Sequence, residues 1–178
     1  ETPAGPWQLV DTLPLSVDIP KQQLMLAKHC WQQDPTRLCL NEDASISAQA
    51  AAATLSLTDY QLAQLNPLLP YASTLGGDLA LDVTLNWQDG QAPDISANIT
   101  GSNGNFTQQL DVPISINWSQ LALNATLAQH QLRSKLDLQL GNQGNLHAQL
   151  LVSDLDKTDR PLRAELNLSQ LTLDFLKP

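Results

Sequence analysis

Cys30 and Cys39 are the residues whose type and spacing most directly suggest chemistry. They lie symmetrically about Asp34-Pro35, so a hairpin that turns there would place them opposite each other on neighbouring strands. That arrangement permits a disulfide, which would close a loop of ten residues and persist only in an oxidising compartment. Two alternatives stay open: two buried thiols in a reducing cell, or a metal site that also uses His29. A structural zinc site would need a fourth ligand, and no clear one is nearby.

The acidic residues near position 154 form a second, weaker candidate site. Asp154, Asp156 and Asp159, with Glu165 eleven residues after Asp154, partly match the ligand spacing of a calcium-binding loop. However, Asp159 stands where that loop needs glycine, and Pro161 interrupts the spacing. We therefore interpret this segment as a solvated loop and predict no metal site.

The histidines do not form a catalytic arrangement. His29, His130 and His147 are far apart in the sequence. No Gly-x-Ser-x-Gly, phosphate-cradling glycine loop or His-Glu-x-x-His motif accompanies them. The sequence therefore predicts a protein that is not an enzyme and that uses no cofactor.

The composition limits the class of partner. The 178 residues are 42% hydrophobic, which suits one globular domain or a piece of a larger one. Nine Lys and Arg against 18 Asp and Glu give a net charge of −9, and no basic run is present, so nucleic acid is excluded as a partner. Leu fills 35 positions and aromatic residues only 8, which predicts a smooth aliphatic interior or groove.

The elements that would position these residues are strands. About a dozen runs alternate apolar and polar residues with a period of two, the pattern of a strand with one wet face. Turn sequences such as Asp89-Gly90 separate the runs, so we predict an all-β, antiparallel meander. The apolar set changes parity near Ser119-Gln120, at residues 129–131 and near Ser169-Gln170, where a turn or bulge is therefore expected.

One apolar face of these strands is the candidate binding site. Charged side chains fall on the opposite parity, at Asp82, Asp111, Arg133, Lys135, Asp137 and Glu165. The predicted groove lining comprises Leu79, Leu81, Val83, Leu85, Ile95, Ile99, Val112, Ile114, Ile116, Leu121, Leu123, Leu136, Leu138, Leu140, Leu150, Leu166 and Leu168. Alternation alone does not distinguish an open groove from the filled core of a closed sandwich or barrel.

One segment breaks the strand pattern. Thr58-Asp59 is positioned to cap a short helix near residues 59–69 that carries Leu62, Leu65 and Leu69 on one side. We interpret it as a crossover connection, with a lid over apolar surface as the alternative. Residues 1–178 as a whole are predicted to be a single β-rich domain, which includes this helix and the cysteine hairpin near residues 24–42. Because the chain begins without Met, we expect it to be a piece of a longer protein.

Three segments together resemble the TamB family, the inner-membrane subunits of the bacterial translocation and assembly module. They are the hairpin at residues 28–40, the segment at residues 62–70 and the glycine-led strand at residues 76–87, and the likeness extends over nearly the whole chain. The resemblance implies a sheet folded like a taco with an aliphatic interior, and a disulfide between Cys30 and Cys39. It also implies the periplasmic part of an inner-membrane-anchored protein of a Gram-negative bacterium, with the outer-membrane protein TamA as partner.

Two roles follow from the resemblance. One is the passage of phospholipid acyl chains between the membranes, as in AsmA-like and bridge-like lipid transfer proteins. The other is a scaffold for unfolded strands of outer-membrane β-barrels and autotransporters. A lipid conduit needs a charge-free aliphatic face and no catalytic chemistry, so we take the conduit as the leading hypothesis.

Overall fold

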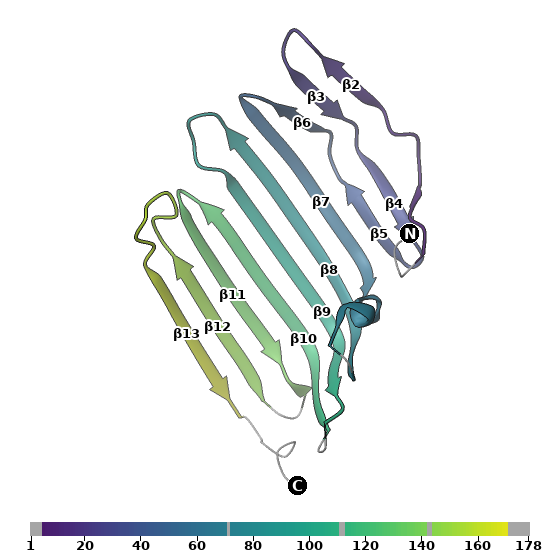
Figure 1. Cartoon of the computed structure of the whole chain (residues 1–178), viewed down its shortest axis with the longest axis vertical. Helices are drawn as coiled ribbons and strands as arrows, with labels where there is room; N and C mark the ends of the chain where they lie inside the picture. Colours follow the sequence, from purple (N-terminus) through teal and green to yellow (C-terminus); the bar gives the residue numbers. More distant parts are fainter. Residues whose placement is uncertain (1–4, 71, 111–112, 142–143, 171–178) are drawn as a thin grey trace.

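The computed structural model of the chain describes residues 5–70, 72–110, 113–141 and 144–170. These residues form one antiparallel sheet of 13 strands and one short 3₁₀ helix (Figure 1). The strands are β1 (Gln8–Leu9), β2 (Leu15–Asp18), β3 (Gln23–Leu26), β4 (His29–Gln33), β5 (Thr36–Leu40), β6 (Ala44–Ser47), β7 (Ala50–Gln61), β8 (Ser73–Gln88), β9 (Asp94–Gln108), β10 (Ile114–Ala128), β11 (Gln131–Gln139), β12 (Asn145–Val152) and β13 (Leu162–Ser169); the helix is η1 (Leu62–Leu68).

The sheet divides at β7. Ala51 and Ala52, near the start of β7, pair with β6, whereas residues 55–58 pair with β5. β6 continues to β3 and β2, and β5 continues to β4 and β1, so the first strands form two branches (Figure 1). From β7 to β13 the strands pair antiparallel in sequence order; hairpin turns join the middle strands, whereas η1 lies in the connection between β7 and β8. We call β1–β7 the forked region and β8–β13 the meander.

The hairpin between β10 and β11 shows how a turn changes the parity of the apolar set. The ladder closes at the pair Ala128 and Gln131, which leaves Gln129 and His130 as a two-residue turn. Both have positive φ, 50° and 59°, as a type I′ turn requires. The apolar positions therefore pass from odd numbers in β10 to even numbers in β11 while staying on the same face.

The helix is shorter than predicted and begins later. Thr58 and Asp59, the expected cap, belong to β7, where the pairing with β8 shifts between Leu57 and Tyr60. The hydroxyl of Thr36 donates to the carbonyl of Asp59, whose φ is 54°, so a bulge occupies the segment that we expected to start the helix.

η1 packs on β8. Asn66 Oδ1 accepts a hydrogen bond of 2.7 Å from the backbone N–H of Leu75, and Leu62 is buried. Pro67 lies inside η1 and has no backbone N–H to donate to the preceding turn, so the helix ends after a few residues.

A bend crosses β8, β9 and β10 beside η1. The pairing of β8 with β9 shifts between Gly76 and Asp78, and the pairing of β9 with β10 skips Asn103 and Ser119. Asn103 has a φ of 49°. This irregularity lies where the change of parity near Ser119-Gln120 predicted one.

The sheet does not close on itself within the described residues. Its path ends at β1 and β13, which do not pair with each other. Only Leu40, Ala44 and Leu62 are buried hydrophobic residues among those described. The accessible surface is 11877 Å², whereas a compact monomer of 19.4 kDa would expose about 8,500 Å². The predicted all-β fold is confirmed as an open, curved antiparallel sheet rather than a closed sandwich or barrel.

Candidate functional site

The register of the sheet aligns apolar side chains from many strands on one face. Cross-strand partners share a face, so following the pairs from strand to strand traces rows that cross the sheet. The central row runs from β4 to β13 and holds Trp31, Leu38, Leu57, Leu81, Ile99, Leu123, Leu136, Ala148 and Leu166.

Three further rows lie alongside the central row. The second holds His29, Leu40, Leu55, Val83, Ala97, Ala125, Ser134, Leu150 and Ala164. The third holds Ala53, Leu85, Ile95, Leu127, Leu132, Val152 and Leu162, and the fourth holds Leu79, Gly101, Leu121, Leu138, Leu146 and Leu168. We call these four rows the aliphatic face.

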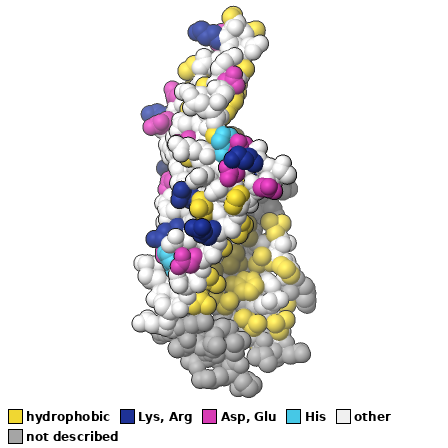
Figure 2. All heavy atoms as spheres, turned by 90° about the vertical axis from the view of Figure 1, so that its left-hand side faces the viewer, with side chains coloured by type: hydrophobic (Ala, Val, Ile, Leu, Met, Phe, Trp, Pro, Cys, Tyr) yellow, Lys and Arg dark blue, Asp and Glu magenta, His cyan; other side chains and the backbone are white. Residues whose placement is uncertain are grey.

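The aliphatic face is not covered by a second layer. Leu55, in the middle of the second row, keeps 39% of its surface exposed, and Leu166 and Leu162 on β13 keep 60% and 66%. Figure 2 shows hydrophobic side chains gathered on one side of the sheet, in its hollowed lower part, and most charged side chains on the other side. A contiguous apolar surface of this kind marks a place where another apolar molecule binds.

A concavity of about 360 Å³ lies over β10–β13, within the range of small-molecule sites. It is lined by Leu123, Leu136, Ala148, Leu150, Ala164 and Leu166, together with Ser134, Gln149 and Glu165. The lining is mostly aliphatic, so it suits a hydrocarbon chain better than a polar ligand.

The register brings most of the predicted groove residues together. Leu79, Leu81, Val83, Leu85, Ile95, Ile99, Leu121, Leu123, Leu136, Leu138, Leu150, Leu166 and Leu168 all belong to the aliphatic face. Leu140 follows β11 in the next hairpin, where its N–H donates to the carbonyl of Gly144. Val112 lies outside the described residues.

Ile114 and Ile116 are not part of the four rows. They lie on β10 beyond the bend, where they pair with Gln108 and Phe106 of β9. The alternation predicted that these two residues continue the aliphatic face. The pairing of β9 with β10 is irregular at the bend, so alternation does not assign residues beyond it to one of the four rows.

The sequence did not identify the part of the aliphatic face in the forked region. Trp31, Leu38, Leu40, Leu55 and Leu57 extend the rows from β8 to β4. Their alternation was visible in the sequence, but runs of four or five residues do not reveal which strands they pair with. Only the register of β7 with β5 and β8 joins them to the longer strands.

Charge is separated between the two faces. The four rows contain no Asp, Glu, Lys or Arg. The adjacent row on the other side of the sheet holds Cys30, Cys39, Ser56, Asp82, Asn98, Asn124, Lys135, Gln149 and Glu165, and we call this side the polar face. Asp111, also predicted on this side, lies outside the described residues. Covering a carboxylate or ammonium group with an apolar guest would cost several kcal/mol unless the group had a partner. The four rows carry no such group, so an apolar guest can cover them without that cost.

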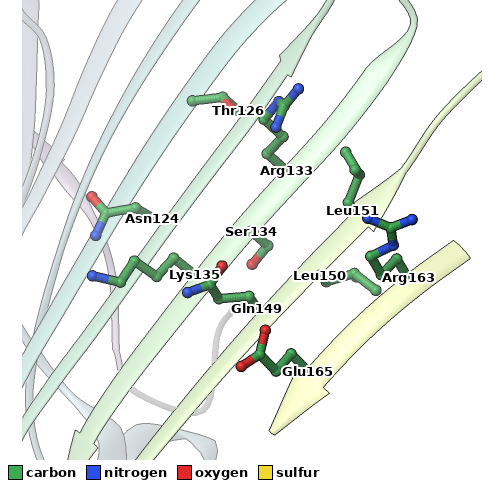
Figure 3. A pocket seen from close by; sticks show the side chains of 10 residues that line it. All are labelled: Asn124, Thr126, Arg133, Ser134, Lys135, Gln149, Leu150, Leu151, Arg163 and Glu165. Carbon is green, nitrogen blue, oxygen red and sulfur yellow. The ribbon is translucent and has the colours of Figure 1, made fainter.

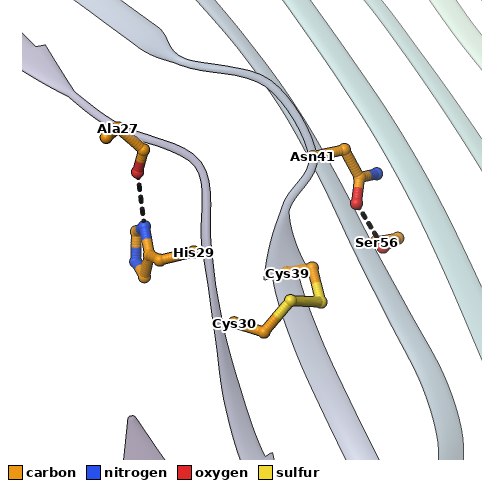
Figure 4. Close-up of a disulfide and its surroundings, with 6 residues drawn as sticks. All are labelled: Ala27, His29, Cys30, Cys39, Asn41 and Ser56. Atoms are coloured by element: carbon orange, nitrogen blue, oxygen red, sulfur yellow. Dashed lines mark hydrogen bonds between the residues drawn. A yellow bond between two sulfur atoms is a disulfide. The ribbon is translucent and has the colours of Figure 1, made fainter. Parts of the chain in front are cut away.

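Cys30 and Cys39 form the expected disulfide, with an S–S distance of 2.05 Å (Figure 4). They are direct cross-strand partners in β4 and β5, as the symmetric spacing about Asp34-Pro35 predicted. The disulfide lies on the polar face, whereas the neighbouring His29 belongs to the aliphatic face and contacts the carbonyl of Ala27 through Nδ1 at 2.8 Å. The two cysteines are therefore neither free thiols nor metal ligands.

The remaining polar residues form local contacts. Lys157 pairs with Asp154 at 2.6 Å in the β12–β13 loop, and His130 lies 3.9 Å from Asp156. In the described part of the chain, no group of three or more His, Cys, Asp or Glu side chains is arranged to hold a metal ion.

Asp137, His147 and Lys135 form a network on the polar face. His147 Nδ1–H donates to Asp137 Oδ1 at 2.5 Å across β12 and β11, and Lys135 Nζ lies 3.4 Å from Asp137 Oδ2. The hydrogen bond from His147, and after it Lys135, lowers the pKa of Asp137 below its usual value of 3.8. The two carboxylate oxygens of Asp137 thus contact His147 and Lys135, as in a surface ion pair.

Comparison with known proteins identifies one family. The family described as "TamB, N-terminal domain" matches residues 1–178. The chain is 27% identical to the translocation and assembly module subunit TamB of Haemophilus influenzae over 98% of its own length. It spans only 13% of the length of that relative. No solved structure matches the chain, and none of the helices in the described residues has the length and hydropathy to span a membrane.

Proposed function

The chain belongs to the TamB N-terminal domain family, and from that premise we propose that its aliphatic face is a stretch of a non-enzymatic conduit for phospholipid acyl chains. The observation that carries the proposal is an aliphatic face that crosses nine strands, holds no charged residue and is left uncovered.

The energetics of hydrocarbon transfer support this role. Moving an acyl chain out of water is favourable by about 0.8 kcal/mol for each buried methylene. Moving it from a bilayer to another aliphatic surface changes the free energy little, since both environments are hydrocarbon. On a continuous aliphatic face, the free energy of an acyl chain therefore changes little from one position to the next, and the chain can move along the sheet.

Localisation and partners of the whole protein belong to the same proposal. The disulfide requires an oxidising compartment, which suits the periplasmic part of an inner-membrane-anchored protein. The family name further suggests that the longer protein acts in the translocation and assembly module together with TamA. We also propose that residues 1–178 form one β-rich domain of that protein.

Photo-crosslinking from the two faces tests the conduit. A photoreactive amino acid replaces Leu123 or Leu136 on the aliphatic face, and in matched variants the neighbouring Ala122 or Asp137 on the polar face. We expect phospholipid adducts, identified by mass spectrometry, from the first two positions only. Equal adducts from both faces, or none from either, would contradict the proposal.

A charge placed in the path gives a second test. Leu123→Asp should strongly reduce the phospholipid that co-purifies with the protein, because a carboxylate on this face must be desolvated when a tail passes. Asn98→Asp adds the same charge on the exposed polar face, beside Ile99, the cross-strand partner of Leu123, and should leave bound phospholipid unchanged. Circular dichroism and the intact disulfide check that both variants are folded. Equal lipid content in the two variants would remove the aliphatic face from the path.

A scaffold for unfolded β-barrel strands is the alternative function. It is favoured by β2 and β13, each of which pairs with only one strand of the described sheet and exposes aliphatic side chains on that edge strand. Crosslinks from exposed Leu162 or Leu166 to outer-membrane protein segments during assembly would support this role. Lipid adducts alone at these positions would favour the conduit.

A further inference from the structure

Positive charge is unevenly distributed along this acidic chain. Five of the nine Lys and Arg residues lie between positions 133 and 163, whereas 12 of the 18 acidic residues precede position 129. The segment from β11 to β13, including the loop between β12 and β13, therefore carries most of the cations of a protein whose overall charge is −9.

Two of these cations flank one apolar residue on the polar face. The register places Arg133 of β11, Leu151 of β12 and Arg163 of β13 in one row, with Thr126 of β10 next to Arg133. Figure 3 shows the two guanidinium groups on either side of Leu151. Strands are spaced by about 4.8 Å, so the two arginine backbones are about 10 Å apart.

The same residues line a concavity of about 460 Å³ on this face. Its lining is Asn124, Thr126, Arg133, Ser134, Lys135, Gln149, Leu150, Leu151, Arg163 and Glu165. Beside the arginines, the lining offers the Thr126 hydroxyl from the same row and the amides of Asn124 and Gln149 from the neighbouring polar row as further hydrogen-bond groups for an anion.

Neither arginine is neutralised by a carboxylate of the described chain. Arg133 Nη2 donates to the neutral amide oxygen of Gln131 at 2.9 Å, and no ion pair of Arg163 occurs within the described residues. The nearby Glu165 accepts a hydrogen bond from Asn167. Lys135 is already paired with Asp137.

We propose that Arg133 and Arg163 together bind a phosphate group on the polar face of the sheet. Guanidinium groups present paired N–H donors that match two oxygens of a phosphate, and two arginines about 10 Å apart can contact one phosphate from both sides above Leu151. The phosphate belongs either to a phospholipid headgroup or to free inorganic phosphate. This site lies on the side opposite the proposed acyl-chain path, so the two proposals stand or fall separately.

Titration with inorganic phosphate tests the site directly. The purified domain is titrated while the arginine side-chain N–H resonances are followed by NMR, and vesicles of phosphatidylglycerol or phosphatidylcholine are tested by co-sedimentation. We expect shifts of the Arg133 and Arg163 resonances. Arg133→Gln with Arg163→Gln should weaken binding at least tenfold, while Arg160→Gln removes one cation from the adjacent loop and should change it less than twofold.

The outcomes separate the sources of phosphate. Binding to phosphatidylglycerol vesicles that depends on both arginines identifies a headgroup, and binding to free phosphate alone identifies the inorganic ion. Binding to neither probe at millimolar phosphate would overturn the proposal. If Arg160→Gln weakens binding as much as the double variant does, the proposal is also overturned. General charge attraction, rather than a site formed by Arg133 and Arg163, would then explain the binding. Loss of lipid crosslinks at Leu123 would not affect this result.

Discussion

The forked region and the meander are held together in different ways. All described side chains that are at least nine-tenths buried, among them Thr36 and Leu40, lie between Gln33 and Ser73, and the disulfide is in the same part of the chain. Beyond Ser73, the long strands chiefly contact their neighbours in the ladder, and η1 packs on β8. In such an arrangement stability is close to a sum of nearest-neighbour terms. An open apolar face thus persists because backbone ladders and local restraints stabilise the sheet without a filled core.

Removing the disulfide should separate the two regions most clearly. Cys30→Ser with Cys39→Ser releases a loop of ten residues, and the chain-entropy relation gives a loss of about 2.5–3 kcal/mol in unfolding free energy. Urea denaturation measures the total, and hydrogen exchange shows where it is lost. We expect faster exchange in β4 and β5, with β11 and β12 little changed. A uniform increase across the whole sheet would contradict the division into two regions.

Gly104→Ala should disturb the meander at its bend. The backbone at Gly104 lies beneath the indole of Trp118, and an added Cβ would come within 1.7 Å of Cε2. The ring must move, which should cost about 1–3 kcal/mol in thermal or urea unfolding. The double variant Gly104→Ala with Trp118→Ala provides the control, since the clash is then absent. Additive losses in this double-mutant cycle would show that the contact does not matter.

The turn between β10 and β11 should be open to improvement. Gln129 and His130 both occupy positive φ, which costs ordinary L-residues about 1–2 kcal/mol each relative to right-handed conformations. Gln129→Asn with His130→Gly supplies the residues that type I′ turns favour, so we expect a gain of about 1 kcal/mol. The gain should appear in β10–β11 hydrogen exchange and not in the forked region. No gain, or a loss, would mean that His130 stabilises the hairpin through its neighbour Asp156.

The smallest expected effect concerns the network on β11 and β12. His147→Ala removes the hydrogen bond that contributes most to the lowered pKa of Asp137, so that pKa should rise toward 3.8. Because the folded-state pKa is lowered, the stabilisation is present above the unfolded-state pKa and is lost as the pH falls through the folded-state value. Carboxyl NMR titration measures the shift, with Lys157→Ala as a control that leaves this network intact. An unchanged Asp137 titration would contradict the assignment.

Two parts of the candidate site show how far the sequence reached. In β8–β12 the alternation is long enough to assign these leucines to a face, and the register then places Leu81, Ile99, Leu123 and Leu136 in one row of that face. In β4–β7 the runs are short and the strand pairing branches, so Leu38 and Leu57 were not assigned to the same surface. The predicted helix cap at Thr58 was wrong, because Thr58 belongs to β7, at a bulge where the pairing with β8 shifts between Leu57 and Tyr60.

The amino-acid sequence by itself determined the period-two pattern, the separation of charged from aliphatic positions and the opposed cysteines. These are properties of neighbouring residues, and strand geometry converts them directly into faces. Only the tertiary structure decided whether the aliphatic face is filled or left open, because that depends on which strands pair at the edges and whether the first pairs with the last. It also decided that Arg133 and Arg163 flank Leu151, since the register between neighbouring strands fixes which residues share a row.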